Sequence, residues 1–162
     1  MIILVDSREQ NPLRFKVAGS VEGVEKATLN VGDYAVRFRD LTQPPVVFER
    51  KAMGDLFGTM TQGYPRFKKE LRRAKEGGID LILIIEGTLG DVLDGTAHSK
   101  FSGESMVQKL FTMQVRYAMP VVFSANRIEM ARHIVEYFEA IGREHVILAK
   151  AKKVVDFSPP IR

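Results

Sequence analysis

Residues 31–51 read VGDYAVRFRDLTQPPVVFERK, a pattern of two apolar runs separated by a turn. From Tyr34 to Phe38 every second side chain is large and apolar, a period of two that is typical of a half-buried strand. Asp40–Pro45 has the composition of a turn, and Val46–Lys51 is a second run that begins with apolar residues. We therefore expect the two runs to pair as an antiparallel hairpin.

The predicted hairpin gathers charged side chains at one of its ends. Glu49 and Lys51 are two positions apart on one strand, so both side chains leave the same face of the sheet. Folding the chain around Asp40–Pro45 pairs residues whose numbers sum to about 85, which sets Asp33 beside Lys51. Asp6 follows the apolar run at the start of the chain, and it joins the cluster if that run is a neighbouring strand.

Carboxylates and a lysine at one point suit the hydrolysis of a phosphodiester. Carboxylate oxygens are ligands that Mg²⁺ and Mn²⁺ prefer, and such an ion keeps several waters. The ion polarises a phosphoryl oxygen and lowers the pKa of a bound water, and a nearby ammonium orients that water or offsets developing charge. The competing interpretation is a solvated strand end, in which Glu49-Arg50-Lys51 makes only surface ion pairs worth at most about 1 kcal/mol.

Apolar patterns divide the rest of the chain into strands and helices. The almost wholly apolar run Asp80–Ile85 indicates a strand buried on both faces, and Gly87–Gly103 is expected to be a loop. The other predicted elements are strands Met1–Val5, Lys26–Asn30 and Val121–Ser124, and helices over 53–60, 67–74, Ser105–Tyr117 and Ile128–Ile141, the last capped by Asn126 and ended by Gly142. This order predicts a single α/β domain.

Composition excludes several classes of protein. The chain has 162 residues, enough for one domain with a sizeable core, and it has no cysteine, which excludes disulfide scaffolds, thiolate metal sites and cysteine nucleophiles. No apolar run approaches the roughly 20 residues of a membrane span, and Met1–Val5 lacks the flanks of a signal peptide. The 24 Lys and Arg against 20 Asp and Glu give a net charge of +4, which permits an anionic partner. We expect an intracellular protein of the cytoplasm or nucleoid, or of the nucleus in a eukaryote, with no membrane association.

Three short motifs together resemble those of the XPF-type structure-specific endonucleases, which belong to the PD-(D/E)XK superfamily. Asp6-Ser7-Arg8-Glu9 follows the first predicted strand, Gly32-Asp33 precedes the hairpin, and Glu49-Arg50-Lys51 is followed by Asp55. The resemblance covers nearly all of residues 1–142. It implies a restriction-endonuclease-like fold, in which helices flank a central mixed sheet.

The resemblance also implies roles for the motif residues. Asp33 and Glu49 would ligate Mg²⁺ or Mn²⁺, with the main-chain carbonyl of Arg50 as a third ligand, and Lys51 would assist the attacking water. The supporting site residues would be Asp6, Arg8, Glu9, Arg50 and Asp55. No acid or base of the motif is missing, which favours a catalytic member of the family over a non-catalytic partner.

A basic segment follows the motif strand. Arg66–Lys75 holds six basic residues and one acid, Glu70, on a predicted helix. The residues that we expect to contact DNA phosphates are Arg66, Lys68, Lys69, Arg72 and Arg73. Residues 143–162 are expected to form a basic, proline-containing tail outside the nuclease domain, and the chain has no recognisable helix-hairpin-helix module.

The sequence therefore predicts a Mg²⁺- or Mn²⁺-dependent endonuclease that hydrolyses phosphodiester bonds in branched or flap-type DNA during repair or recombination. The resemblance implies a homodimer. The alternative is a non-catalytic DNA-binding or dimer-partner module with a fossil nuclease site. A third interpretation is a sequence-specific restriction-like or junction-resolving enzyme, with the same chemistry on a different substrate.

Overall fold

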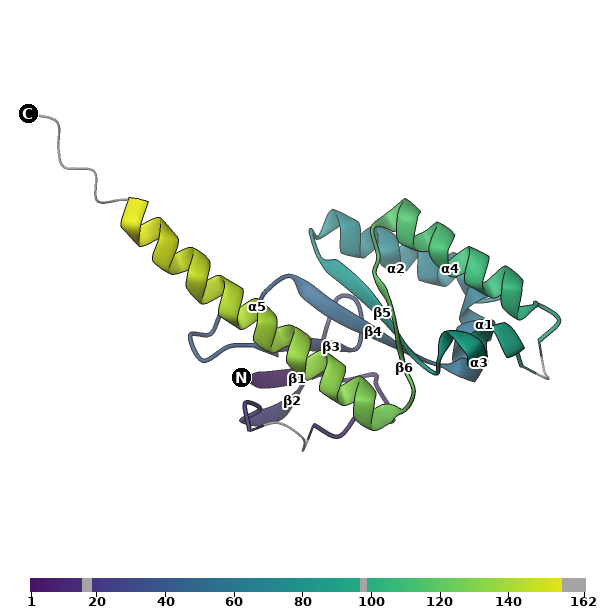
Figure 1. Ribbon diagram of the computed structural model, residues 1–162, viewed down its shortest axis with the longest axis horizontal. Coiled ribbons are helices and arrows are strands. Elements are labelled where there is room, and N and C mark those ends of the chain that lie inside the picture. The colour runs from purple at the N-terminus through teal and green to yellow at the C-terminus, as the bar shows by residue number, and fades with distance from the viewer. Residues whose placement is uncertain (16–18, 97–98, 156–162) are drawn as a thin grey trace, which may run out of the picture.

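The protein folds around one six-stranded sheet (Figure 1). The structure, a computed structural model, describes residues 1–15, 19–96 and 99–155, with side chains as far as residue 147. The strands lie in the order β2-β1-β3-β4-β5-β6, and their bounds are β1 Ile2–Asp6, β2 Gly23–Ala27, β3 Tyr34–Arg37, β4 Val46–Ala52, β5 Asp80–Glu86 and β6 Val121–Ser124. β3 runs antiparallel to β1 and β4, and the other neighbours are parallel, so the sheet is mixed.

Helices cover both faces of this sheet. The helices are α1 Met53–Met60, α2 Tyr64–Glu76, α3 Leu89–Asp94, α4 Gly103–Tyr117 and α5 Arg127–Val155. The first four pack on one face and α5 packs on the other (Figure 1). In β5, Leu83 and Ile85 face the first group while Ile82 and Ile84 face α5, so this strand is buried on both faces, as its apolar run predicts. The expected α/β fold, a mixed sheet flanked by helices, is confirmed.

The hairpin of β3 and β4 forms as predicted, but its register differs. Tyr34 pairs with Phe48, whereas the expected register places it opposite Lys51. The chain reverses early, because Leu41 takes the left-handed conformation (φ 67°) and its N–H donates to the carbonyl of Phe38 over 3.0 Å. Pro44-Pro45 therefore belongs to the returning segment rather than to the turn. The shift moves Asp33 away from Lys51 and places it beside residues 48–50 of β4.

The second strand lies earlier in the chain than expected. A second strand exists as predicted, but the bounds Lys26–Asn30 are wrong, since β2 spans Gly23–Ala27 and pairs in parallel with β1. Beyond Ala27 the main chain forms hydrogen bonds with side chains rather than with a neighbouring strand. The N–H of Leu29 donates to the Asp6 carboxylate (2.8 Å), and its carbonyl accepts from Arg8 (2.8 Å).

Part of the expected Gly87–Gly103 loop is helical. α3 begins after Thr88, whose hydroxyl accepts from the N–H of Asp91, while the Asp91 carboxylate accepts from the N–H of Thr88. This capping box stabilises a short helix that apolar spacing alone does not reveal. The loop expectation is therefore wrong over Leu89–Asp94.

The last helix is longer than predicted. Asn126 caps α5 as expected, with its side chain accepting from the N–H groups of Ile128 and Glu129 (3.0 Å each), but Gly142 does not end the helix. A glycine inside a helix costs only about 1 kcal/mol relative to alanine, and a Cβ at Gly142 would lie 3.2 Å from the Phe38 ring, so the glycine permits a close approach. The basic segment after residue 142 is helical to Val155, and the predicted Pro159-Pro160 end lies outside the described residues.

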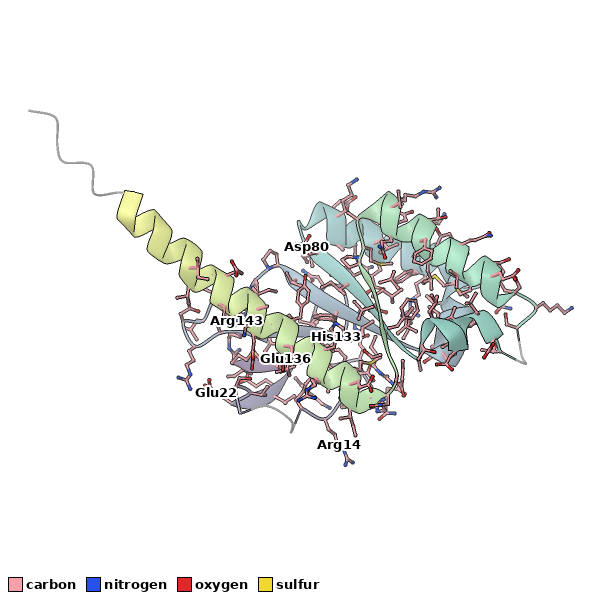
Figure 2. All side chains as sticks on the ribbon, viewed as in Figure 1. Arg14, Glu22, Asp80, His133, Glu136 and Arg143 are labelled. Carbon is pink, nitrogen blue, oxygen red and sulfur yellow. The ribbon has the colours of Figure 1, made fainter. Side chains whose placement is uncertain are left out.

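The outer side of α5 carries both polar and apolar side chains, and Ile128, Val146 and Ile147 are among its exposed apolar residues. Figure 2 shows His133 and Glu136 along this side, and both are exposed. Among the helices of the described part of the chain, none is long and apolar enough to cross a membrane.

Candidate active site

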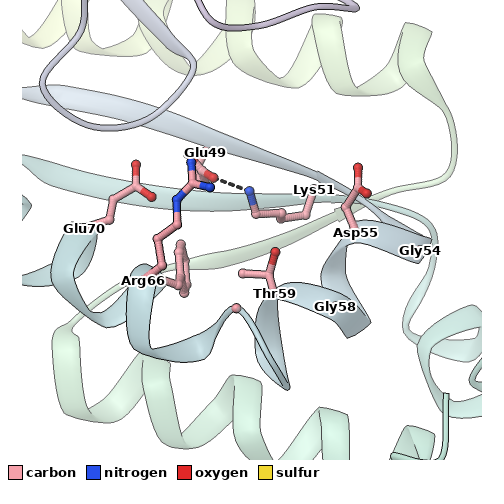
Figure 3. Close-up of a pocket in the computed structure, with 10 residues that line it drawn as sticks. Glu49, Lys51, Gly54, Asp55, Gly58, Thr59, Arg66 and Glu70 are labelled. Atoms are coloured by element: carbon pink, nitrogen blue, oxygen red, sulfur yellow. Dashed lines mark hydrogen bonds and ion pairs between the residues drawn. The ribbon is translucent and has the colours of Figure 1, made fainter.

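A cavity of about 420 Å³ lies where β4 runs into α1 and faces α2 (Figure 3). Glu49 and Lys51 of β4 form one wall, and Asp55 and Gly58 of α1 form another. Two further charged residues from α2 line it, and they are Arg66 and Glu70. The cavity therefore joins the end of the motif strand to the basic helix.

Glu49 and Lys51 form an ion pair inside this cavity. Their side chains leave the same face of β4, as their spacing predicts, and the Lys51 ammonium donates to the Glu49 carboxylate. Burial, followed by the nearby Asp33 carboxylate, raises the pKa of Glu49 to about 8. Burial alone lowers the pKa of Lys51, but the charges of Glu49 and then Asp33 outweigh it and raise that pKa above its ordinary value.

Asp33 is held against the main chain of β4 by two hydrogen bonds, one from its own N–H and one to its carboxylate. Its N–H donates to the carbonyl of Phe48 (2.8 Å), and its carboxylate accepts from the N–H of Arg50 (2.8 Å). Burial raises the pKa of Asp33 to about 6, although the Arg50 hydrogen bond and the Lys51 charge oppose the shift. The two motif carboxylates and the lysine therefore lie at one end of the hairpin.

Asp6 lies at the end of β1, which neighbours β3 as the conditional prediction required. Its N–H donates to the carbonyl of Asp33 (2.8 Å), and its buried carboxylate binds the guanidinium of Arg8 (2.6 Å). Burial alone raises the pKa of Asp6, but hydrogen bonds from Arg8 and Leu29 hold it below its usual value. Asp6 therefore secures the chain beside Asp33 rather than facing the cavity, and Arg8 acts through it.

Arg50 leaves the opposite face of β4 from Glu49. Its guanidinium contacts Glu86 at the end of β5 (2.7 Å) and lies 3.9 Å from Glu9, and its side chain is only 10% exposed. Arg127 at the start of α5 lies 3.9 Å from the same Glu86 and donates to the carbonyl of Pro12 (2.9 Å). This partly buried network joins the segment after β1 to the end of the motif strand on the α5 side.

Glu70 is the site residue that sequence reasoning missed. Its carboxylate accepts a hydrogen bond from the N–H of Gly32 (3.0 Å), directly before Asp33. Its charge also raises the pKa values of Asp33 and Glu49. One signal in the sequence points to it, because it is the acid of an otherwise basic run and borders the buried stripe of α2 that contains Phe67 and Leu71.

The five predicted DNA-contacting residues differ in whether they line the cavity. All of them are exposed on α2, and they are Arg66, Lys68, Lys69, Arg72 and Arg73. Arg66 lines the cavity, whereas the other four do not. Lys68 lies over the ring of Tyr64, 5.2 Å from its centroid.

The donor groups fit a hard divalent ion. Glu49 of β4 and Asp33, directly before β3, supply carboxylate oxygens, and a cation would relieve their mutual repulsion. In a strand, the N–H and the carbonyl of one residue point toward the same neighbouring strand. The N–H of Arg50 donates to Asp33 on the β3 side, so the carbonyl of Arg50 faces that side as well. No group of three or more His, Asp or Glu in the described residues is arranged to hold an ion. Mg²⁺ requires less, since one or two carboxylates plus substrate phosphates commonly hold it.

The family model of the ERCC4 domain matches residues 5–137, which is most of the chain. The chain belongs to the ERCC4 domain family. Among solved structures, XPF from Aeropyrum pernix is similar with a TM-score of 0.66 at 18% identity, and the match covers 100% of this chain and 76% of that one. XPF from Aeropyrum pernix in complex with DNA gives a TM-score of 0.66 at 20% identity and covers 88% of this chain and 65% of that one. No curated protein sequence matches the chain.

This ERCC4 domain thus has the XPF fold, and the resemblance drawn from its three motifs is confirmed. At 18% and 20% identity, the likeness to the solved structures concerns the fold and not individual side chains. The roles of the motif residues therefore depend on the geometry described above.

Proposed function

We propose that this ERCC4 domain is a Mg²⁺- or Mn²⁺-dependent endonuclease that cuts branched or flap-type DNA during repair or recombination. The observation that carries the proposal is that Glu49 and Lys51 line a solvent-accessible cavity, while the Asp33 carboxylate is held by the N–H of Arg50, the residue between them. On a solvated strand end, the carboxylates of Asp33 and Glu49 would be exposed separately, and nothing would bring them together in a buried site. Residues 1–142 are the proposed nuclease unit, and the basic segment 143–162 lies outside it.

In this proposal Asp33, Glu49 and the Arg50 carbonyl hold the divalent ion. The bound ion supplies Lewis-acid chemistry, polarising a phosphoryl oxygen and acidifying a water. Lys51 keeps its proton, because neighbouring carboxylates raise its pKa. Its ammonium orients the attacking water and offsets charge that develops on the phosphate.

The supporting residues keep these groups in place. Asp6 and Arg8 fix the chain beside Asp33, and Glu9 and Arg50 hold the end of β4 from its other face. Asp55 lies in the first turn of α1 at the wall of the cavity, where its exposed carboxylate is available to accept a hydrogen bond from a water.

The DNA strand is proposed to cross the cavity toward α2. Arg66 provides a phosphate contact at its wall, and the other basic residues of α2 extend the positive surface beyond it. Gly54 and Gly58 leave the α1 wall open, since a Cβ added at either would meet no atom within 4 Å. The solved complex of XPF from Aeropyrum pernix with DNA supports a nucleic-acid ligand for this fold.

Cleavage of labelled flap, forked and duplex DNA, with Mg²⁺ or Mn²⁺ and with EDTA as the negative control, tests the proposal. We expect metal-dependent cutting of branched substrates that Asp33→Asn and Lys51→Ala abolish while binding persists. If the wild type binds DNA and cuts none of the substrates, the protein is a non-catalytic binding module. If cutting follows base sequence rather than branching, it is a restriction-like or junction-resolving enzyme.

A homodimer is part of the proposal. On α4, Met106 and Leu110 cover the sheet, but Phe111 is 48% exposed and Val115 is 87% exposed on the outer side. A second copy of the chain would cover these apolar side chains. Light scattering with size-exclusion chromatography should give a dimer for the wild type and a monomer for Phe111→Glu. A DNA substrate also implies an intracellular location, which fractionation of the source cells tests.

A further inference from the structure

The turn that presents Asp33 depends on a glycine with one unusual hydrogen-bond partner. Gly32 has φ +71° and is buried, and a Cβ there would lie 2.3 Å from the Val47 side chain. The Gly32 N–H does not bond to the adjacent strand β4, because the carbonyl of Phe48 there accepts from the N–H of Asp33. A buried N–H requires a partner, and Glu70 provides it from a helix 38 residues further along the chain.

A carboxylate is a costly partner at this position. Its charge adds to those of Asp33 and Glu49, and it raises the pKa values of both. A neutral acceptor would satisfy the same N–H without this repulsion.

Glu70 also lies on the side of α2 that faces the substrate cavity. Figure 3 shows Glu70 and Arg66 rising from α2 beside the strand that carries Glu49. The hydrogen bond to Gly32 is therefore a direct link between the helix proposed to contact DNA and the loop that carries a proposed metal ligand.

We propose that Glu70 is a positioning residue of the metal site, which fixes the Gly32-Asp33 turn so that the Asp33 carboxylate meets the divalent ion. Glu70 acts through the Gly32 N–H and is not itself a ligand. This inference rests on the proposed function.

Mn²⁺ binding to the full chain, followed by electron paramagnetic resonance, tests this role independently of cleavage. Glu70→Ala removes the acceptor, and we expect it to weaken Mn²⁺ binding about 10- to 100-fold, while Glu70→Gln keeps an acceptor and stays within about threefold of wild type. The Gly32 amide should exchange its hydrogen faster in Glu70→Ala and at the wild-type rate in Glu70→Gln. Glu76→Ala is the matched control, because Glu76 is exposed at the end of the same helix.

Two results would overturn the inference while leaving the proposed function intact. One is wild-type Mn²⁺ affinity in Glu70→Ala, and the other is binding by Glu70→Gln as weak as that of Glu70→Ala. If Glu70→Ala does not fold, Glu70→Leu replaces it, since leucine keeps the bulk of the side chain without an acceptor. A wild-type chain that neither binds Mn²⁺ nor cuts DNA contradicts the proposed function itself, and the inference falls with it.

Discussion

The main-chain N–H of Arg50 donates a hydrogen bond to the carboxylate of Asp33, 2.8 Å away. The strand that carries Glu49 and Lys51 thus also holds Asp33. The carboxylates of Asp33 and Glu49 lie close together in a largely buried site. Lys51 alone pairs with Glu49 in the described structure. An excess of buried negative charge follows, and it makes stability depend on pH and on cations.

The metal-free protein should lose stability as pH rises from about 5 to 8.5. The pKa values of Asp33 and Glu49 are raised to about 6 and about 8, above the value near 4 of an unfolded carboxyl. Within that window the native state binds more protons than the unfolded state, so the free energy of unfolding falls with pH. Urea unfolding in EDTA across this range measures the slope.

Asp33→Asn should flatten that profile, and Mg²⁺ should raise wild-type stability more at pH 8 than at pH 5. Glu136→Gln, on the exposed side of α5, should leave the profile unchanged. A wild-type stability that increases with pH in EDTA, or an equal slope in Asp33→Asn, would show that the two carboxylates are not buried together.

Gly32→Ala should destabilise the protein by about 3 kcal/mol. Alanine at φ +71° is strained, and its Cβ would clash with Val47, which adds overpacking to backbone strain. Chemical denaturation monitored by circular dichroism measures the change. A loss below about 0.5 kcal/mol, which is the scatter of ordinary surface substitutions, would contradict the conformation of this turn.

Gly58→Ala should have the opposite effect on stability. Gly58 lies within α1 with open space at its Cβ, so alanine should raise the free energy of unfolding by about 0.5–1 kcal/mol. The added methyl group narrows the cavity, so the rate of DNA cleavage should decrease even though the protein is more stable. A variant that is both more stable and fully active would exclude a DNA strand against α1.

Arg66→Ala should weaken DNA binding equally for all sequences. Removing one phosphate contact should reduce the slope of log K against log salt by about 0.7–0.9. Fluorescence anisotropy at several salt concentrations measures both effects. Arg143→Ala is the control, because Arg143 lies on α5, which packs on the other face of the sheet from α2. If both variants give the same slope as wild type, Arg66 makes no phosphate contact.

Local patterns in the sequence predicted the elements of the site well. The period of two set Glu49 and Lys51 on one face, and the apolar run from Asp80 identified a strand buried on both sides. The register of the hairpin was not predictable, because it depends on Leu41 adopting a left-handed conformation, which leucine seldom does. The length of α5 was missed for a related reason, since Gly142 accommodates the Phe38 ring and does not cap the helix.

Strand periodicity and short motifs are local properties of a chain. They were therefore enough to predict the fold class, the family, and the acidic and basic side chains of the motif strand. Two contacts became visible only in the folded chain: Asp33 lies against Arg50, and Glu70 accepts a hydrogen bond from the turn before Asp33. Both contacts depend on where α2 packs on the sheet and where the hairpin reverses. Those positions follow from burial of apolar side chains far apart in the chain, which no local pattern encodes.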